Sequence, residues 1–385
     1  MAVTDRASSN DEALLVDAVR DFARTELLPL DRACDADGSH LSPSLPRLGE
    51  MGLFNICLPE SLGGLGCTYL TYARIIHEVS YASPSAAVTL SVHNMVGNIL
   101  HHYAAEPLAT QWLQGWGDPA NFAGFAITEA EAGSNPAAAR TRALASDGGY
   151  RVTGEKMWIT NGLSARWFLV LAQTDPSGSK DGLIALMVDG QAPGLERTPI
   201  TGKMGIRGSE TVVLHLSDVF VPTAHQLGEV GDGLKVCLST LNEGRVGIAA
   251  QATGIAEACL DEMTSYATQR TQFGRPIAEF QAIQNMVADS AVELAAAKEL
   301  VRRAAELIDA GLSSPSASSM AKLFASEAAG RIADRAVQVH GGAGYVRECR
   351  VEQLYRDARV TRIYEGTSEI QRVVIARELL GPASN

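Results

Sequence analysis

The hydrophobic and polar positions of the chain fall into three successive patterns, and the first of these is helical. Over about 11–121, apolar residues recur every three or four positions, a spacing that predicts amphipathic helices. We expect a helix ahead of Pro29 and further helices over 73–79 and 96–103. Prolines and glycines at 59–66 should break the middle of this segment.

The second pattern, over about 122–222, consists of short β-rich runs. Runs such as WFLVLAQT, LIALMVD and TVVLHLSDVFVP are separated by clusters of turn formers such as TDPSGSKDG. This alternation predicts a compact antiparallel sandwich or barrel of about 100 residues.

The third pattern returns to long helical periods after Gly231. One stripe contains Ile255, Cys259, Met263 and Tyr266. A second helix follows over 283–301 and can end at Gly311, and two more are expected over 320–340 and 368–380. Ser368 and Gln371 have the S-x-x-Q spacing of a capping box at the start of the last helix.

These patterns predict three domains in the order helices, sheet, helices. We expect an N-terminal α-helical domain over 1–121, a middle β-domain over 122–232 and a C-terminal α-helical bundle over 233–385. The fold class is therefore α+β and multidomain. With 46% hydrophobic residues, 20% charged residues and a mean hydropathy of +0.02, the chain is also unlike a disordered or fibrous protein.

Charge and cysteine content exclude several classes of function. The 32 basic and 44 acidic residues give a net charge of −12, which would repel nucleic acid and anionic lipid. The start of the chain resembles neither a signal peptide nor a transit peptide, and no apolar run reaches about 18 residues, so we expect a cytoplasmic protein without membrane insertion. Without a CxxC pair, the cysteines are expected to be reduced core thiols: Cys34, Cys57, Cys67, Cys237, Cys259 and Cys349.

Two segments have the composition of a functional site, although neither is specific by itself. VHGGAGY at 339–345 could bring backbone N–H groups close to a phosphate, but a turn between helices is the commoner role of such a segment. Glu365, in TRIYEGTSEIQ, could act as a partly desolvated base, but a solvated or capping glutamate is commoner. No serine has a GxSxG context and no histidine pair has metal spacing, so hydrolase and metalloenzyme classes lack support and no metal is expected.

Five longer segments resemble the acyl-CoA dehydrogenase family in that family's order and spacing. The resemblance is closest to the short-chain and bacterial type and covers essentially the entire chain. The segments are FAITEAEAGSNPAA (125–138), KMWITNG (156–162), MGIRGSETVVLHLSDVFVP (204–222), GRVGIAAQATGIAEACLDEMTSYATQRTQFGRPIAEFQAIQ (244–284) and VQVHGGAGYVRECRVEQLYRDARVTRIYEGTSEIQR (337–372).

The resemblance implies both a fold and an activity. Family members have an N-terminal helical domain, a central antiparallel β-domain and a C-terminal four-helix bundle, and they form homotetramers as dimers of dimers. They use FAD to convert an acyl-CoA to its trans-2-enoyl-CoA. Glu365 is implied to take the Cα proton as a hydride passes from Cβ to flavin N5, with electron-transfer flavoprotein as the next electron acceptor. An acyl chain of about four to eight carbons is expected from the short-chain type.

Individual residues are assigned by the same resemblance. A neighbouring subunit is expected to present Arg270, Gln272 and Phe273 to the cofactor. The full set of implied FAD contacts is Phe125, Ile127, Thr128, Trp158, Thr160, Arg270, Gln272, Phe273, Gln281, Gln338, Gly341, Gly342, Thr367 and Glu369. Implied contacts to acyl-CoA are Ser134, Asn242, Glu243, Gly244, Arg245 and Gly366.

The chain departs from the family pattern at two of its motifs. The AGSD signature reads AGSN, with Asn135, and the familiar Asp before the xGR turn is Asn242. Both changes remove a negative charge near the implied CoA site. Some relatives place the base immediately before the arginine that matches Arg245, where this chain has Gly244. Glu243 lies one residue earlier and should point away, because one helical step turns a side chain by about 100°.

Two other functions remain as alternatives. A flavin oxidase of the same superfamily would pass electrons directly to O₂, but such oxidases tend to be longer or to have Asp as the base. A catalytically silent acyl-CoA-binding protein would have lost the base or the flavin residues, whereas Glu365, Trp158, Thr160 and Arg270 are all present.

Overall fold

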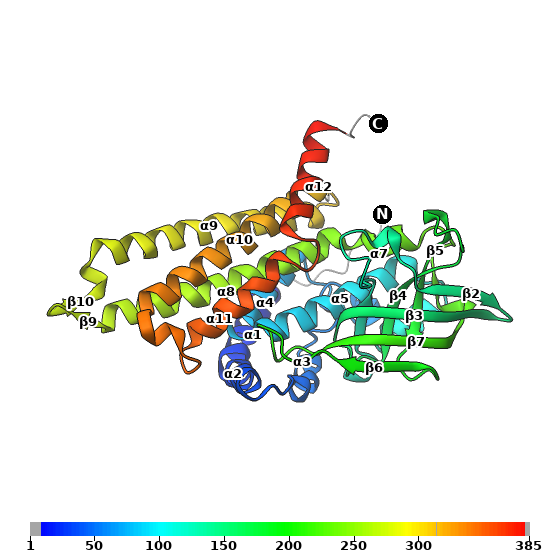
Figure 1. Cartoon of the computed structure of the whole chain (residues 1–385), viewed down its shortest axis with the longest axis horizontal. Coiled ribbons are helices and arrows are strands. Elements are labelled where there is room, and N and C mark those ends of the chain that lie inside the picture. Colours follow the sequence, from blue (N-terminus) through cyan, green and yellow to red (C-terminus); the bar gives the residue numbers. More distant parts are fainter. Residues whose placement is uncertain (1–8, 313, 382–385) are drawn as a thin grey trace.

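The computed structural model describes residues 9–312 and 314–381, which form a long helical body with a β-domain at one end (Figure 1). The first part of the chain is helical, as predicted. Its helices are α1 (Ser9–Phe22), α2 (Leu28–Asp37), α3 (Leu45–Glu50), α4 (Tyr69–Ala82), α5 (Pro84–Tyr103) and α6 (Leu108–Gln114).

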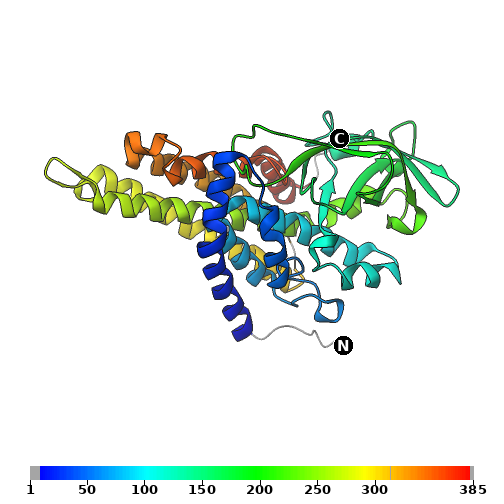
Figure 2. The same ribbon diagram turned by 90° about the horizontal axis from the view of Figure 1, so that it is seen from below.

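The helical path does not end at Pro29. A π-helical turn at Ala23–Leu27 joins α1 directly to α2, and Pro29 falls in the first turn of α2. A proline is tolerated there because the first N–H groups of a helix have no partner within the helix. Figure 2 shows α1 crossing the long helices of the body.

The middle of the chain forms one eight-stranded sheet. Most pairings are antiparallel, as predicted, but β1 pairs with β4 in parallel, and β2 and β4 meet in one parallel pair. The strand order is β6-β7-β3-β2-β4-β5-β8, with β1 beside β4. The strands are β1 (Ala123–Ala126), β2 (Arg142–Ser146), β3 (Gly149–Thr160), β4 (Trp167–Gln173), β5 (Leu183–Asp189), β6 (Leu195–Pro199), β7 (Thr211–Pro222) and β8 (Gln226–Leu227).

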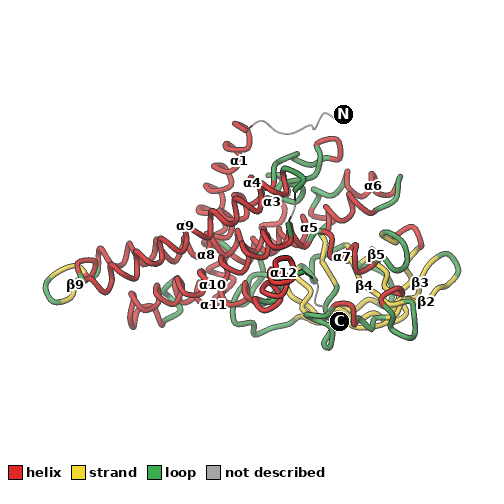
Figure 3. The backbone as a smooth tube through the Cα atoms, turned by 90° about the horizontal axis from the view of Figure 1, so that it is seen from above, coloured by secondary structure: helices red, strands yellow, loops and turns green. Residues whose placement is uncertain are grey.

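The last part of the chain is dominated by three long helices that run side by side (Figures 1 and 3). The hairpin β9–β10 lies at the end of the body farthest from the sheet. The elements are α7 (Gly233–Ser239), α8 (Leu241–Gln269), β9 (Thr271–Gln272), β10 (Arg275–Pro276), α9 (Gln281–Asp309), α10 (Pro315–His340), α11 (Arg350–Ala358) and α12 (Ser368–Leu380). Among the described helices, none is long and apolar enough to cross a bilayer.

The predicted capping box at Ser368 is wrong by one residue. Thr367 is the N-cap of α12, and its side chain accepts a hydrogen bond from the backbone N–H of Ile370. Ser368 instead donates its hydroxyl to Glu327 of α10 at 2.8 Å. Gln371 turns back toward the preceding loop, because the side-chain amide donates to backbone carbonyls at 365 and 366.

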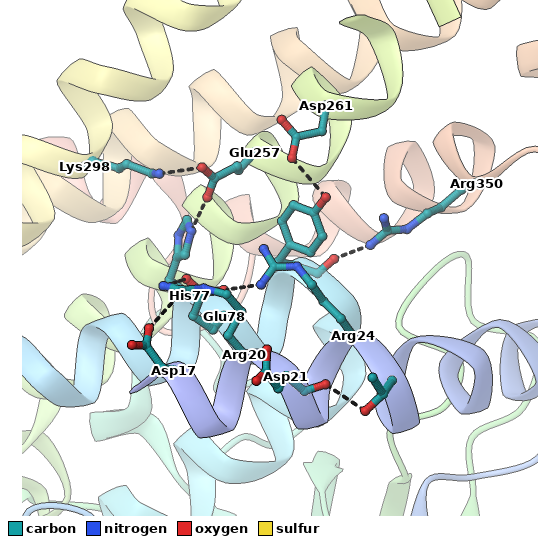
Figure 4. A network of polar contacts seen from close by, with 12 residues as sticks. Asp17, Arg20, Asp21, Arg24, His77, Glu78, Glu257, Asp261, Lys298 and Arg350 are labelled. Atoms are coloured by element: carbon teal, nitrogen blue, oxygen red, sulfur yellow. Dashed lines mark hydrogen bonds and ion pairs between the residues drawn. The ribbon is translucent and has the colours of Figure 1, made fainter. Parts of the chain in front are cut away.

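A network of ionic side chains fastens α1 to α4 and joins α4 to the long helices (Figure 4). Glu78 of α4 accepts hydrogen bonds from Arg20 and Arg24, both at 3.0 Å. One residue earlier, His77 contacts Glu257 of α8, whose other carboxylate oxygen accepts from Lys298 of α9 at 2.9 Å. The helical part of the chain is therefore held together by polar contacts as well as by its apolar core.

A second polar junction connects all three parts of the chain around Arg356 of α11. Its guanidinium donates to both carboxylate oxygens of Asp35 on α2, at 2.8 and 2.6 Å, and to Glu352. It also donates to the backbone carbonyl of Met204, in the loop before β7, at 3.0 Å. Next along the chain, the carboxylate of Asp357 accepts a hydrogen bond from the backbone N–H of Ile206.

Candidate active site

Glu365 lies in the loop just before α12, and its backbone is in the left-handed region at φ +52°. Gly366 follows at φ +86°. A non-glycine residue in this region is uncommon and is typical of functional sites. The Oε2 atom of Glu365 is buried and has no hydrogen-bond partner among the described residues. The turn therefore presents a desolvated carboxylate oxygen to the protein interior.

The start of α8 faces this carboxylate. A Cβ added to Gly244 would lie 2.9 Å from Oε2 of Glu365 and 3.2 Å from Sδ of Met95 on α5. A side chain at position 244 would therefore occupy the place of the Glu365 carboxylate. Positions 244 and 365 thus converge on one point, and in this chain the carboxylate there comes from position 365.

Glu243 points elsewhere, as the helical geometry predicted. Its carboxylate accepts a hydrogen bond from the side-chain amide of Asn98 at 3.3 Å and interacts with the hydroxyl of Tyr69. Burial raises the pKa of Glu243 to about 7, against the effect of these two hydrogen bonds. The carboxylate is therefore engaged on α4 and α5 rather than beside Glu365.

Two cations act on the base. Burial raises the pKa of Glu365, while the positive charges of Arg245 and Lys322 lower it. Arg245 is buried in α8 and donates to the side-chain oxygen of Asn242 at 3.2 Å. Burial makes this carboxylate a stronger base than a solvated one, which suits it to accept a proton from a weak carbon acid.

On the β-domain, Trp158 has an exposed and strained position. The register of β3 against β7 shifts between Lys156 and Ile159, and Trp158 takes φ +63° within this bulge. Its side chain is 58% exposed, so it is not the core aromatic that a strand residue would usually be. Such a large exposed indole is a surface on which a planar ring can stack.

Polar residues of the same motif hold this bulge against β1. The backbone N–H of Met157 donates to the carbonyl of Thr128 at 2.8 Å. The buried ammonium of Lys156 donates to the carbonyl of Ile127 at 3.0 Å and pairs with Glu129 at 2.7 Å. The structure thereby brings together the predicted ring contacts: Phe125, Ile127, Thr128, Trp158 and Thr160.

A small apolar cluster connects this group to the base. Val88 and Val92 of α5 and Ile206 are its buried members, and Phe125 and Tyr364 pack against them. Since Phe125 belongs to the β1 group and Tyr364 precedes Glu365, the exposed indole and the base belong to one region of the molecule.

Seven of the other predicted FAD contacts lie at the far end of the helical body. Arg270, Gln272 and Phe273 are on the exposed β9 hairpin, with the Phe273 side chain 92% exposed, and Gln281 begins α9. The end of α10 lies beside the end of α8, where the rings of His340 and Tyr266 stack at 4.2 Å. Gln338, Gly341 and Gly342 are exposed there.

The surroundings of Glu365 and the Arg270 hairpin lie at opposite ends of α8. Gly244, beside the base, and Arg270, just past the end of α8, are separated by about 39 Å at 1.5 Å per residue. This exceeds the span of one extended FAD molecule.

The remaining predicted residues lie in the loop after β1 or around the start of α12. Ser134 is exposed in the loop after β1. Thr367 caps α12, and Glu369 is exposed in the first turn of that helix. Gly366 lies next to the base, where the side-chain amide of Gln371 would meet any Cβ at 2.7 Å.

Several residues around Glu365 could not be predicted from the sequence. Lys322 donates to the carbonyl of Gly366, Met95 lies beside Glu365 next to Gly244, and Tyr72 lies next to Gly247. Helical periodicity could only mark these positions as interior. For Lys322 the available signal was a lysine at an interior position of a helix. A lysine is almost never fully buried without partners, so such a position indicates a polar contact.

The described residues fit a flavin cofactor better than a metal ion. Trp158 supplies an exposed ring surface, and a Cβ added to Gly341 or Gly342 would meet nothing within 4 Å, so a ligand could approach the backbone there. Over 9–312 and 314–381, no group of three or more His, Cys, Asp or Glu side chains could hold a metal.

Comparison with known proteins gave matches along the chain. The models for the N-terminal, middle and C-terminal domains of acyl-CoA dehydrogenase match residues 9–117, 124–219 and 231–380. The chain is 42% identical to the mitochondrial short-chain specific acyl-CoA dehydrogenase of Mus musculus over 371 residues, 95% of this chain and 89% of that protein.

Two solved structures are also similar over nearly their full length. Butyryl-CoA dehydrogenase from Megasphaera elsdenii has a TM-score of 0.94 at 34% identity, with 98% of this chain and 100% of that chain covered. A glutaryl-CoA dehydrogenase from Mycobacterium smegmatis in complex with FADH2 has a TM-score of 0.92 at 30% identity, with 99% and 97% covered.

Proposed function

Since the chain belongs to the FAD-dependent acyl-CoA dehydrogenase family, we propose that it oxidises the Cα–Cβ bond of an acyl-CoA thioester with Glu365 as the base. The observation that carries this proposal is the buried, unpartnered Oε2 of Glu365 in its left-handed turn. Membership of the family also makes the protein an oxidoreductase.

The residues around Glu365 account for the proton-transfer half of this reaction. Oε2 accepts the Cα proton, and Gly244 leaves room for the Glu365 carboxylate because it has no side chain. The backbone N–H of Glu365 polarises the thioester carbonyl, which stabilises the developing enolate charge. FAD, when bound, supplies the hydride acceptor that no side chain can provide. The Trp158 region would hold its ring.

We propose that two copies of the chain complete each cofactor site. The length of α8 between Gly244 and Arg270 supports this, because it is greater than the span of one FAD. A homotetramer, an electron-transfer flavoprotein as acceptor and a cytoplasmic location are further parts of the proposal that rest on resemblance to the family.

Replacing Arg270 with alanine should therefore reduce FAD retention and weaken the oligomer together. We expect the variant to purify with less than one FAD per chain, as measured by absorbance. Arg275→Ala is the matched control on the same hairpin, where the arginine lies over the Phe280 ring and should not affect flavin content. A stable, fully flavinated monomer in sedimentation velocity would contradict the shared site.

We propose a short acyl substrate, and the α8 face next to the base supports this. Gly247 lies about one turn beyond Gly244, and a Cβ added there would lie 2.8 Å from the hydroxyl of Tyr72 and 3.3 Å from that of Ser91. An acyl chain that runs along α8 from the base would meet these hydroxyls within about one turn.

Tyr72→Ala should consequently make the preferred acyl chain longer by about two or more carbons. The measurement is kcat/KM across saturated acyl-CoAs of increasing length. Tyr72→Phe keeps the ring and should keep the wild-type preference. If Tyr72→Ala prefers the same length as the wild type, Tyr72 does not limit the chain.

The reaction itself is tested by anaerobic mixing of the flavinated protein with a panel of acyl-CoAs. We expect the visible flavin band to bleach with at least one short acyl-CoA and the product to be the enoyl-CoA. No bleaching with any thioester would favour a silent binding protein. Fast reoxidation by air, with one peroxide per turnover, would favour an oxidase.

A further inference from the structure

The loop that carries the base is held by two donors from different helices. Lys322 of α10 is 0% exposed, and its ammonium donates to the carbonyl of Gly366 at 2.7 Å. The side-chain amide of Gln371, on α12, donates to the carbonyls of Glu365 and Gly366 at 3.0 and 2.9 Å. Both donors act on carbonyls of the left-handed turn itself.

A fully buried ammonium is costly unless charged or polar groups surround it. Burial lowers the pKa of Lys322 to about 8, so the side chain is still mostly charged at neutral pH. The charged side chains that act on it are Glu365, Arg245, Glu327 and Glu369. Two of these four are the base and the other cation that faces the base.

The surroundings of the base show how few cations face it. Among the described residues, the titratable groups that interact with Glu365 are Arg245 from α8, Lys322 from α10, Tyr72 from α4 and the adjacent Tyr364. The two tyrosines are neutral near pH 7. Arg245 and Lys322 therefore supply the positive charge that favours an ionised base.

We propose that Lys322 is a positioning residue of the reaction, which fixes the Gly366 carbonyl and, through its charge, keeps the Glu365 carboxylate ionised in its buried site. The proposal rests on the proposed function, because it needs Glu365 to be the base. It assigns Lys322 two effects: a contact with the loop and a positive charge near the carboxylate. Gln371 shares the contact with the loop but carries no charge, so a comparison of the two residues separates these effects.

The experiment compares Lys322→Met with Gln371→Met as flavinated proteins. The rate of flavin reduction is measured against pH with the best acyl-CoA of the panel. Lys322→Met should move the acid limb of the profile upward by about one pH unit or more, which lowers the rate on that limb by about tenfold or more. Gln371→Met should lower the rate without moving the limb. An unmoved limb in Lys322→Met would overturn the proposal.

A conservative variant separates charge from shape. Lys322→Arg keeps the positive charge and should keep the wild-type midpoint of the acid limb. If Lys322→Met does not fold or hold flavin, Lys322→Gln takes its place as the neutral variant with the same expected shift. A shift of equal size in Lys322→Arg would show that packing rather than charge is responsible, and would overturn the proposal.

A second measurement does not depend on activity. In a double-mutant cycle of Lys322→Met and Glu365→Gln, the unfolding equilibrium constants in urea at pH 7 should show a coupling of about tenfold. Additive single effects would count against a direct charge interaction and overturn the proposal. Full flavin reduction by Glu365→Gln would instead remove the proposed base, and with it the proposed function and this role of Lys322.

Discussion

Glu365→Gln should reduce the rate of anaerobic flavin reduction on the order of 10³-fold or more while FAD and acyl-CoA remain bound. Glutamine has nearly the same shape, so the turn at φ +52° and the contacts from Lys322 and Gln371 to its backbone should persist. Only the proton acceptor is lost. Stopped-flow absorbance gives the rate, and the spectral change on adding substrate gives binding.

Glu243→Gln is the matched control. It removes a second carboxylate close to Gly244. An oxygen of this carboxylate accepts a hydrogen bond from Asn98 and does not face Glu365. We expect this variant to keep most of the wild-type rate. If Glu243→Gln lost the rate and Glu365→Gln kept it, the base would move to α8.

The wild-type rate should also depend on pH in a defined direction. Burial raises the pKa of Glu365 above the ordinary carboxyl range, and only the ionised form can take a proton. The rate should therefore rise as the pH rises through that pKa, and the Glu365→Gln variant should lack this rise.

Arg356→Met should destabilise the protein by about 3 to 5 kcal/mol, because it leaves the buried Asp35 and the nearby Glu352 without their shared cation. The same guanidinium joins α2, α11 and the loop at Met204, so its loss removes contacts between all three parts of the chain. The free energy of unfolding in urea is the measurement.

Arg47→Met serves as the control, since Arg47 pairs with Glu50 on an exposed surface and should change the stability little. Equal effects of the two variants would show that burial of the Arg356 junction has no energetic consequence.

The junction around Arg356 also predicts how stability depends on pH. Burial raises the pKa values of Asp31 and Asp357, so the folded state binds more protons than the unfolded state above the ordinary carboxyl range. Stability from these two groups is full below about pH 4 and is lost as the pH rises through their folded pKa values. Arg356→Met should extend this loss to higher pH, since it removes a cation that lowers the pKa of Asp357.

Several parts of the fold could be predicted from local sequence. The elements that were not predicted have physical reasons. Helix periods and turn clusters predicted the order helices, sheet, helices. The strands β2 and β6 were missed because RALAS and LERTP are short and largely exposed, without a clear apolar alternation. The continuation of helix through Pro29 was missed because proline is compatible with a first turn.

The candidate site also has features that the sequence predicted and features that it could not predict. The motifs predicted roles for Glu365 and Trp158, but spacing carries no information on backbone strain, so the positive φ angles of both residues became visible only in the structure. Gln371 was assigned to a capping box from its spacing, whereas its amide reaches back to the base loop. The contact between Lys322 and Gly366 spans 44 residues of sequence, and no local pattern encodes it.

The docking of the base loop on α10 and α12 means that the loop is not a portable motif. A designer who grafts IYEGTS onto another scaffold transfers a carboxylate and a glycine. The graft lacks the ammonium from Lys322, the amide from Gln371 and the bare helix surface at Gly244. In such a graft the glutamate would be an ordinary solvated side chain. A transplant that keeps Glu365 in this environment must include at least the parts of α8, α10 and α12 that contact the loop.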